Sequence, residues 1–372
     1  MRKYFIIFII FYGFISFSVS CKKETDEVVK NTDVLDTLIN YESPQYFPEF
    51  RNPANNPLTK RGVELGRMLF YDPILSSDSS ISCASCHNAA YSFSDNRRFS
   101  VGVDGAIGSI QAMPLINLAW QNKFFWNGRK NSLEEQALEP INNPIEMHET
   151  SANVVAKLMR NEDYRKRFRW AFGSDQITPE MIGRAIAQFE RTMVSYQSKY
   201  DIIYDKAVRL GIGQAFDNAD EFFGFNIFNS ERGQCFHCHG TQTALLAHNI
   251  DTLFRNNGLM NDSEISGKGL SEITGRPEDD GLFKVPIMRN IELTAPYMHD
   301  GRFTSLEQVV EFYSSGIKQN RNLDINFSKD PNRIEQYGGL GFTEDEKRAL
   351  VAFLKTLTDT SFINNPAFQN PF

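Results

Sequence analysis

Two five-residue segments contain the residue types best suited to chemistry. Cys83–His87 has the sequence CASCH and Cys235–His239 has the sequence CFHCH, so both match Cys-x-x-Cys-His. Two thiols at this spacing can bond to the two vinyl groups of one porphyrin, and the adjacent His can then bind the iron. The sequence therefore predicts two covalent c-type haems. Their expected attachment residues and axial ligands are Cys83, Cys86 and His87, and Cys235, Cys238 and His239.

Other uses of these cysteines account for less of the pattern. A zinc ribbon places its second Cys-x-x-Cys about 15–20 residues after the first, whereas Cys86 and Cys235 lie in different halves of the chain. A thioredoxin-like redox pair needs a βαβ setting and leaves both His residues unexplained. Disulfides within each motif would close loops too short to stabilise the chain. Haem attachment explains the Cys and the His residues together.

The composition is that of a globular protein. Of the 372 residues, 41% are hydrophobic and 23% are charged, which is ordinary for a folded chain. This length suggests two compact domains. The formal net charge of −7 argues against a nucleic-acid-binding protein, which normally has a basic surface.

The N-terminus has the pattern of an export signal. A short basic start precedes the apolar run Tyr4–Val19, and a polar segment follows Cys21, as in a secretory signal peptide. Ser18–Cys21 resembles a bacterial lipobox, in which the Cys becomes the lipidated first residue; a plain signal peptide with an incidental Cys is the alternative. We expect a signal peptide at 1–20 and a lipid-anchored tether at 21–45. The protein would then reside in the cell envelope or periplasm, touching a membrane only through its lipid.

The elements that must position the haem motifs repeat along the chain. Leu65–Phe70 and Phe223–Phe228 each have a Gly four residues before a Phe. A closing amphipathic helix is expected after Thr178 in the first half, since Thr178 can cap a helix whose first residue is Pro179. In the second half, Thr343 begins a capping box before another amphipathic helix.

Each half thus reads as a helix, a haem loop, a long irregular segment and a closing helix. Because β signals are sparse, we predict an all-α fold of two cytochrome c-like domains with long loops. The expected N-terminal domain spans 46–200 and contains the first haem motif. The C-terminal domain spans 201–360 and contains the second haem motif, and 361–372 form a tail.

The segments around the motifs resemble the bacterial dihaem cytochrome c peroxidase and MauG family. The resemblance covers roughly Asn52 to Thr358. It implies that the haem of the N-terminal domain reacts with peroxide and that the haem of the C-terminal domain transfers electrons. The segments that carry it are Leu65–Pro73, Ser80–Cys83, Phe125–Arg129, Ser132–Leu138, Asn143–Met147, Phe283–Pro286 and Arg289–Gly301.

This resemblance implies roles for residues that would otherwise attract no attention. Glu146 matches the family's distal acid–base residue, Gln136 the polar residue beside it and Trp126 the aromatic bridge between the haems. A carboxyl in an apolar pocket can move a proton from one peroxide oxygen to the other, because burial raises its pKa toward the useful range. An amide can hold peroxide without titrating. Without the family, Glu146 would be read as a surface residue and Trp126 as core.

Two departures from the family pattern affect the haem ligands. Many members have a His after the first motif that covers the iron until the other haem is reduced, but here Asp104 stands near that position. The first haem is therefore expected to be open without prior reduction. Many members also have a Met as the far ligand of the second haem, where this chain has Tyr313, as in MauG. A phenolate ligand favours higher oxidation states than a Met does. Met298 is the runner-up ligand.

A third departure concerns calcium. The family binds this ion between its domains through an Asn side chain and backbone carbonyls. Thr294 and Pro296 match the carbonyl donors, but Gln111 stands where Asn is usual. Calcium is expected as a cofactor beside the two haems.

The resemblance implies an oxidoreductase: a peroxidase that reduces hydrogen peroxide to water with electrons from a small cytochrome c or cupredoxin. The alternative is a MauG-like enzyme that uses peroxide to oxidise side chains of a partner protein. A non-catalytic dihaem electron carrier is a third reading, which Glu146 argues against. The oligomeric state, a homodimer included, stays open.

Overall fold

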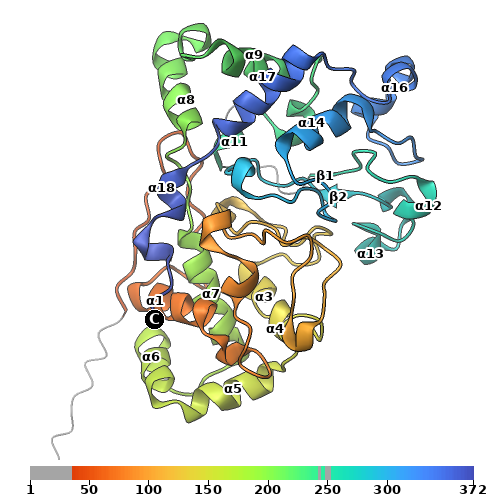
Figure 1. Cartoon of the computed structure of the whole chain (residues 1–372). Coiled ribbons are helices and arrows are strands. Elements are labelled where there is room, and N and C mark those ends of the chain that lie inside the picture. The colour runs from red at the N-terminus through yellow and green to blue at the C-terminus, as the bar shows by residue number, and fades with distance from the viewer. Residues whose placement is uncertain (1–35, 242–243, 248–252) are drawn as a thin grey trace, which may run out of the picture. The chain divides into compact units, whose positions relative to one another are not determined.

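The computed structural model describes residues 36–241, 244–247 and 253–372 (Figure 1). The helices of the first half are α1 (Lys60–Tyr71), α2 (Cys83–Cys86), α3 (Leu133–Gln136), α4 (Glu139–Asn142), α5 (Ser151–Arg160), α6 (Glu162–Phe172) and α7 (Pro179–Thr192). The following helices are α8 (Lys199–Leu210), α9 (Ala219–Phe228), α10 (Phe236–His239), α11 (Ala244–Ala247), α12 (Asp262–Ile265), α13 (Ser271–Thr274), α14 (Leu306–Ser315), α15 (Ile325–Ser328), α16 (Pro331–Tyr337), α17 (Glu344–Lys355) and α18 (Thr360–Ile363).

Extended structure is scarce among the described residues. Strands β1 (Phe254–Arg255) and β2 (Phe283–Lys284) form one antiparallel pair, with Phe254 opposite Lys284. The prediction of a mostly helical chain is confirmed in this part of the protein.

In the first half, α1 crosses α7 at very short range. A Cβ on Gly66 would lie 1.9 Å from the carbonyl oxygen of Ala185, so only glycine permits this crossing. One turn further along, the rings of Phe70 and Phe189 pack edge to face at 5.4 Å. Helix α7 begins as predicted, since the Thr178 side chain accepts a hydrogen bond from the backbone of Met181.

In the second half, α9 crosses α17 in the same way. A Cβ on Gly224 would lie 1.9 Å from the carbonyl oxygen of Ala349, and the rings of Phe228 and Phe353 again lie 5.4 Å apart. Thr343 forms the predicted capping box at the start of α17. The internal repeat seen in the sequence is therefore a repeated helix crossing (Figure 1).

Two large apolar clusters accompany the two crossings. The first draws on α1, α5, α6 and α7, and the second on α9, α14, α16 and α17. Helix α8 begins close to the domain boundary expected at residues 200 and 201, and that boundary stays a prediction. Of the expected tail, Phe362 and Phe368 pack in the first cluster, and Tyr71 donates a hydrogen bond to the carbonyl of Phe368 (2.6 Å).

Buried polar contacts connect the two halves. The Asn290 amide donates to the Ser92 hydroxyl (2.8 Å), and its oxygen accepts from the backbone of Asp359 (2.6 Å). Arg289 is 0% exposed and donates across the boundary to the carbonyl of Ser195 (2.7 Å), while it pairs with Asp201 in its own half (2.9 Å). Because buried polar groups must keep their partners, these contacts hold the halves in one register.

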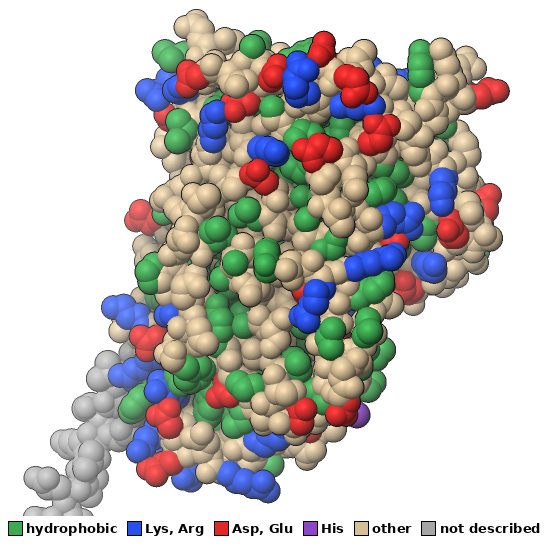
Figure 2. Space-filling view, in the orientation of Figure 1, with side chains coloured by type: hydrophobic (Ala, Val, Ile, Leu, Met, Phe, Trp, Pro, Cys, Tyr) green, Lys and Arg blue, Asp and Glu red, His purple; other side chains and the backbone are tan. Residues whose placement is uncertain are grey.

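The N-terminal segment bears on the expected anchor, and the surface shows how charge is distributed. The expected signal peptide and Cys21 lie outside the described residues, whereas Ile39, within the expected tether, donates a backbone hydrogen bond to Leu58 (2.9 Å). Within 36–241, 244–247 and 253–372, no helix is long and apolar enough to cross a membrane. Acidic and basic side chains are interspersed on the face shown in Figure 2.

Candidate functional site: two cavities that share a tryptophan

The first Cys-x-x-Cys-His motif opens onto a cavity, here called the first cavity. The predicted residues that line it are Cys83, Cys86, His87, Trp126, Gln136 and Glu146. Helix α2 supplies the thiols, and the Ser82–Ser85 capping box fixes its start. The irregular segment before α5 supplies Glu146, so residues far apart in sequence converge on one space.

His87 is oriented by a tight turn that the sequence did not reveal. Its Nδ1 lies 2.8 Å from the carbonyl oxygen of Phe93. Ser92 and Phe93 both adopt left-handed backbone conformations (φ +55° and +58°), which turn this carbonyl toward the ring. Burial lowers the pKa of His87, so the ring stays neutral. A neutral imidazole with one nitrogen bonded to a carbonyl presents its other nitrogen as a metal ligand.

Glu146 is a half-buried acid held from two sides. The Asn143 amide donates to its Oε1 (2.7 Å), and its own carbonyl accepts from the backbone of Val103 (2.8 Å). Burial raises the pKa of Glu146, while the Asn143 hydrogen bond and the charge of Arg129 oppose the shift. The carboxylate is therefore a stronger base than that of an exposed Glu, and the protonated carboxyl can still return its proton to a reacting group.

The loop that contains Asp104 lies against the backbone of Glu146. A Cβ on Gly102 would come within 2.4 Å of the carbonyl oxygen of Glu146, so the loop approaches closely at this glycine. Asp104 itself is exposed and does not line the first cavity. Among the described residues that line this cavity, His87 is the only imidazole.

The first cavity contains a second carboxyl that sequence reasoning missed. Glu190 on α7 is 3% exposed and lines the cavity, and its Oε2 has no hydrogen-bond partner among the described residues. Burial raises its pKa to about 8, and Arg191 opposes part of this shift. The sequence contained a signal for this buried carboxyl, because Glu190 lies four residues after Ile186, on the apolar face of the helix. The Gln136 Oε1 is another buried atom without a partner.

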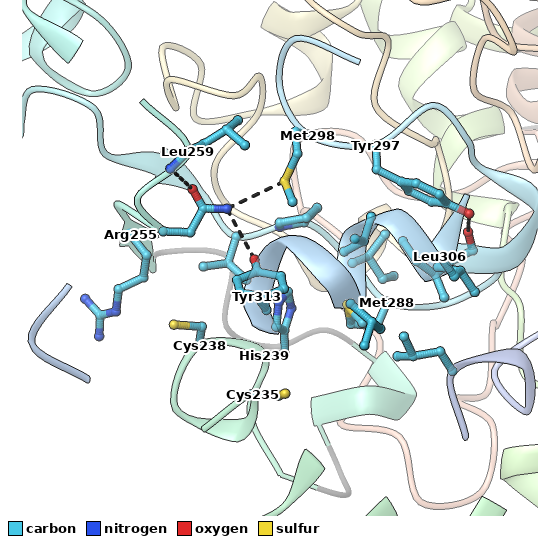
Figure 3. A pocket seen from close by; sticks show the side chains of 18 of the residues that line it. Cys235, Cys238, His239, Arg255, Leu259, Met288, Tyr297, Met298, Leu306 and Tyr313 are labelled. Carbon is cyan, nitrogen blue, oxygen red and sulfur yellow. Dashed lines mark hydrogen bonds between the residues drawn. The ribbon is translucent and has the colours of Figure 1, made fainter. Parts of the chain in front are cut away.

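The second motif opens onto a second cavity, shown in Figure 3. The predicted residues that line it are Cys235, Cys238, His239, Thr294, Pro296, Met298 and Tyr313. Burial lowers the pKa of His239 to about 4, and the carbonyl of Pro286 opposes part of that shift.

Both candidate far ligands approach the same side chain in the second cavity. The Asn257 amide donates to the Tyr313 hydroxyl (3.2 Å) and to the Met298 sulfur (3.5 Å). Burial raises the pKa of Tyr313, and the hydrogen bond from Asn257 opposes this shift. The structure thus brings Tyr313 and Met298 together, and the choice between them as ligand stays open at this point.

Trp126 lines both cavities. Its indole is 8% exposed and donates from Nε1 to the carbonyl of Gln111 (2.9 Å). The backbone of Lys284, on β2, donates to the carbonyl of Trp126 (2.8 Å). On the side of the second cavity, the ring of His299 lies 6.4 Å from the Trp126 ring. These contacts fix an aromatic group between the two spaces.

The expected calcium donors also lie at this junction. Thr294 and Pro296 line the second cavity, and Gln111 lines both cavities. The backbone of Gln111 donates to the carbonyl of His299 (2.9 Å), which brings the two segments together. The donor set is neutral oxygen, a chemistry that calcium accepts.

Comparisons with known proteins place this geometry in a family. A family model described as di-haem cytochrome c peroxidase matches residues 60–208. The cytochrome c551 peroxidase of Nitrosomonas europaea is 38% identical over 313 residues, which cover 83% of this chain and 82% of that protein. The chain belongs to the dihaem cytochrome c peroxidase family.

Two further proteins are similar to this chain over most of its length. The methylamine utilization protein MauG of Methylorubrum extorquens is 36% identical over 308 residues, covering 82% of this chain and 80% of that protein. The crystal structure of a MauG-like protein associated with microbial copper homeostasis superposes with a TM-score of 0.77 at 34% identity, covering 90% of this chain and 99% of that one.

Haem is the cofactor of this family, and the cavities suit it. The four motif thiols are free and none forms a disulfide in the described chain. Apolar side chains such as Ile186 in the first cavity, and Leu350 and Leu354 in the second, complete the walls. Free thiols beside a neutral, buried imidazole in an apolar space fit a porphyrin and its iron.

Proposed function

We propose that this protein reduces hydrogen peroxide to water in the first cavity, with electrons that enter near the second. The donor is a small cytochrome c or a cupredoxin. Overall, one peroxide, two electrons and two protons give two waters. The protein's task is to bind peroxide, move a proton between its oxygens, and admit the electrons without letting other reactions compete.

The position of Glu146 carries this proposal. It lines the same cavity as His87, and burial raises its pKa. In the proposed reaction, Glu146 takes the proton from one peroxide oxygen and gives it to the other, which leaves as water. The Asn143 hydrogen bond keeps the carboxyl in place during this transfer. Gln136, whose Oε1 is buried without a partner, accepts a hydrogen bond from peroxide.

Each cavity holds one covalently attached haem in this proposal. Cys83 and Cys86 would hold the first, with His87 as an iron ligand. Cys235 and Cys238 would hold the second, with His239 and Tyr313 as iron ligands. Bound haem would supply the iron redox chemistry of peroxide reduction. The domains 46–200 and 201–360 would each carry one haem.

Trp126 is the proposed route for electrons between the cavities. It lines both, and its hydrogen bond to Gln111 holds the ring in one orientation. A fixed aromatic ring between two redox centres shortens each electron step. Calcium bound by the carbonyls of Thr294 and Pro296 would tie the segments that flank this ring.

The first cavity is proposed to accept peroxide in the fully oxidised protein. Asp104 is exposed, and no imidazole other than His87 is among the described residues that line the cavity. No second imidazole among these residues would therefore have to move before peroxide binds.

Tyr313 favours one alternative function. A phenolate ligand on the second iron would stabilise higher oxidation states, which suits a MauG-like enzyme that uses peroxide to oxidise side chains of a partner protein. A non-catalytic electron carrier has no use for Glu146. We retain peroxide reduction as the main function because the acid in the first cavity serves it directly.

We infer a location in the cell envelope or periplasm. The apolar run after a basic start supports export, and Cys21 supports a lipid anchor. The small donor proteins that the proposed reaction oxidises would be reduced again by the same compartment's electron-transfer chain.

The test is peroxide-dependent oxidation of a reduced small cytochrome c by the protein matured with both haems. Glu146→Gln should lower the turnover number by about 10²–10⁴-fold, the usual contribution of a general acid–base group. Haem content, measured as pyridine haemochrome, should not change, because only the proton transfer is lost.

The matched control is Glu135→Gln, which makes the same change on an exposed residue of α3 outside the first cavity. It should behave as the wild type. Turnover of Glu146→Gln within about a factor of two of the wild type would remove Glu146 from the mechanism. Peroxide consumption that needs a partner protein but no reduced cytochrome would favour the MauG-like alternative.

A further inference from the structure

Asn257 occupies a central position in the second cavity. Its Nδ2 lies 3.2 Å from the Tyr313 hydroxyl and 3.5 Å from the Met298 sulfur. Figure 3 labels Tyr313 and Met298 and marks a hydrogen bond at each of them with a dashed line; Tyr313 lies on α14 and Met298 in the loop before it. One side chain therefore contacts both groups that the sequence nominates as far ligand of the second iron.

The orientation of this amide is determined by the backbone. Asn257 Oδ1 accepts a hydrogen bond from the backbone N–H of Leu259 (3.2 Å). A backbone N–H can only donate, so the oxygen of the amide must face it. The NH₂ group is then directed at Tyr313 and Met298, and each of its two hydrogens has one acceptor.

The segment that carries Asn257 is held in place on both sides. Arg255, in β1, precedes it and pairs with β2. Gly258 follows in a left-handed conformation (φ +74°), and its carbonyl accepts from the backbone of Lys318 (2.7 Å). The Asn256 carbonyl accepts from the backbone of Asp324 (3.0 Å). The amide is thus preorganised and does not depend on the groups that it contacts.

The Tyr313 ring is also restrained. It stacks on Phe327 at a centroid distance of 6.1 Å and lies edge-on to Phe312 at 5.0 Å. The hydroxyl at the far end of this ring is directed to Asn257 within the same cavity as His239. A ring packed on its face can still pivot slightly, and the amide hydrogen bond limits where its oxygen points.

We propose that Asn257 is a positioning residue that makes Tyr313, rather than Met298, the sixth ligand of the second haem. This inference rests on the proposed second haem site. One N–H of the amide orients the Tyr313 oxygen toward the iron position. The other N–H engages the Met298 sulfur and keeps its lone pair away from the metal.

The same hydrogen bond should tune the redox potential. An N–H that donates to a metal-bound phenolate withdraws electron density from the oxygen and weakens its donation to the iron. Asn257 therefore keeps the potential of the second haem higher than an unassisted Tyr ligand would. Removal of the donor should shift that potential downward or, if the sulfur replaces the oxygen, sharply upward.

The experiment compares Asn257→Leu and Asn257→Asp with the wild type, in the full-length protein with both haems. Asn257→Asp keeps the shape of the side chain and the oxygen that accepts from Leu259, but it loses the NH₂ group that donates to Tyr313 and Met298. It replaces Asn257→Leu as the test if that variant does not fold. The readouts are the EPR and optical spectra and the midpoint potential of each haem. We expect two haems, an unchanged first-haem potential, and an altered spectrum and shifted potential for the second haem.

The matched control is Asn256→Asp, which removes an amide from the adjacent residue. The Asn256 amide donates to Asn320 (3.0 Å) rather than to a candidate ligand. It should leave the second-haem spectrum unchanged. If it reproduces the effect of Asn257→Asp, loop distortion is the cause and the proposal is overturned.

A second series places both Asn257 changes in a Tyr313→Phe background. The part of the effect that acts through the Tyr313 oxygen should disappear there, because that hydrogen bond has lost its acceptor, whereas release of the Met298 sulfur should still change the second-haem spectrum. Unchanged second-haem spectra in Asn257→Leu or in Tyr313→Phe alone would overturn the proposal. Peroxide turnover is measured separately. If the wild type shows no turnover, the proposed function is contradicted, but the second-haem potentials of the Asn257 variants still test the role of Asn257.

Discussion

The two cavities are built on the same helix crossing but differ in the polar groups that face the cofactor. Glu190 follows Phe189 on α7, and Leu354 follows Phe353 at the equivalent place on α17; each lines its own cavity. The first cavity also has Glu146 and Gln136, which can handle protons. The second has Tyr313 and Asn257, which can serve as a ligand and its support.

This difference supports the proposed division of two tasks on one scaffold. A haem placed by two thiols and a His does not by itself choose between peroxide chemistry and electron transfer. Carboxyl groups in the first cavity allow proton movement, whereas a ligand at the sixth position of the second iron would exclude peroxide from it. The repeated helix crossing explains how one fold accommodates both sets.

The largest effect should follow removal of the attachment residues, one motif at a time. Cys83→Ala with Cys86→Ala, and separately Cys235→Ala with Cys238→Ala, should each leave one covalent haem in place of two. Haem-stained denaturing gels and pyridine haemochrome give the count. Only the first pair should also abolish the reaction with peroxide. Two covalent haems in either double variant would refute the assignment.

A smaller effect should distinguish the first cavity, which contains the buried Glu190 carboxyl, from the second, which has Leu354 at the equivalent place. The quantity concerned is the pH dependence of the free energy of unfolding. Burial raises the pKa of Glu190 from 4.5 to about 8. The unfolded chain therefore releases this proton near pH 4.5 and the folded chain near pH 8. The associated stability is present below pH 4.5 and is lost as the pH rises to about 8.

Glu190→Gln should remove this loss, at about 1.4 kcal/mol for each unit of pKa shift. Its free energy of unfolding relative to the wild type should rise between pH 5 and pH 8, as measured by urea denaturation. Leu354→Glu should introduce the same pH dependence in the second half. Parallel pH profiles for Glu190→Gln and the wild type would contradict a buried, protonated Glu190.

The smallest effect should test the helix crossing that is repeated in the two halves, α1 with α7 and α9 with α17. Gly66→Ala and Gly224→Ala each place a Cβ 1.9 Å from a carbonyl oxygen of the crossing helix. Each should destabilise the protein by about 1–3 kcal/mol, as overpacking does. Gly213→Ala is the control, since no described atom lies within 4 Å of its Cβ. A large loss in only one half would mean that the crossings are not equivalent.

Much of this arrangement could be predicted from local sequence. Thr178 and Thr343 predict the starts of α7 and α17, because a capping side chain accepts a hydrogen bond from the backbone two or three residues away. The Cys-x-x-Cys-His motifs are equally local. Glu146, Gln136 and Trp126 needed the family resemblance, since a single Glu, Gln or Trp has no local signature.

The remaining features arise only when distant segments meet. The sequence by itself determined the helix starts, the haem motifs and the glycine–phenylalanine repeat, all of which depend on neighbours a few residues apart. Tertiary structure decided that Trp126 borders both cavities, that the Phe93 carbonyl orients His87, and that Asn257 reaches Tyr313 and Met298. Those contacts depend on loop paths, and loop paths follow from packing rather than from periodicity.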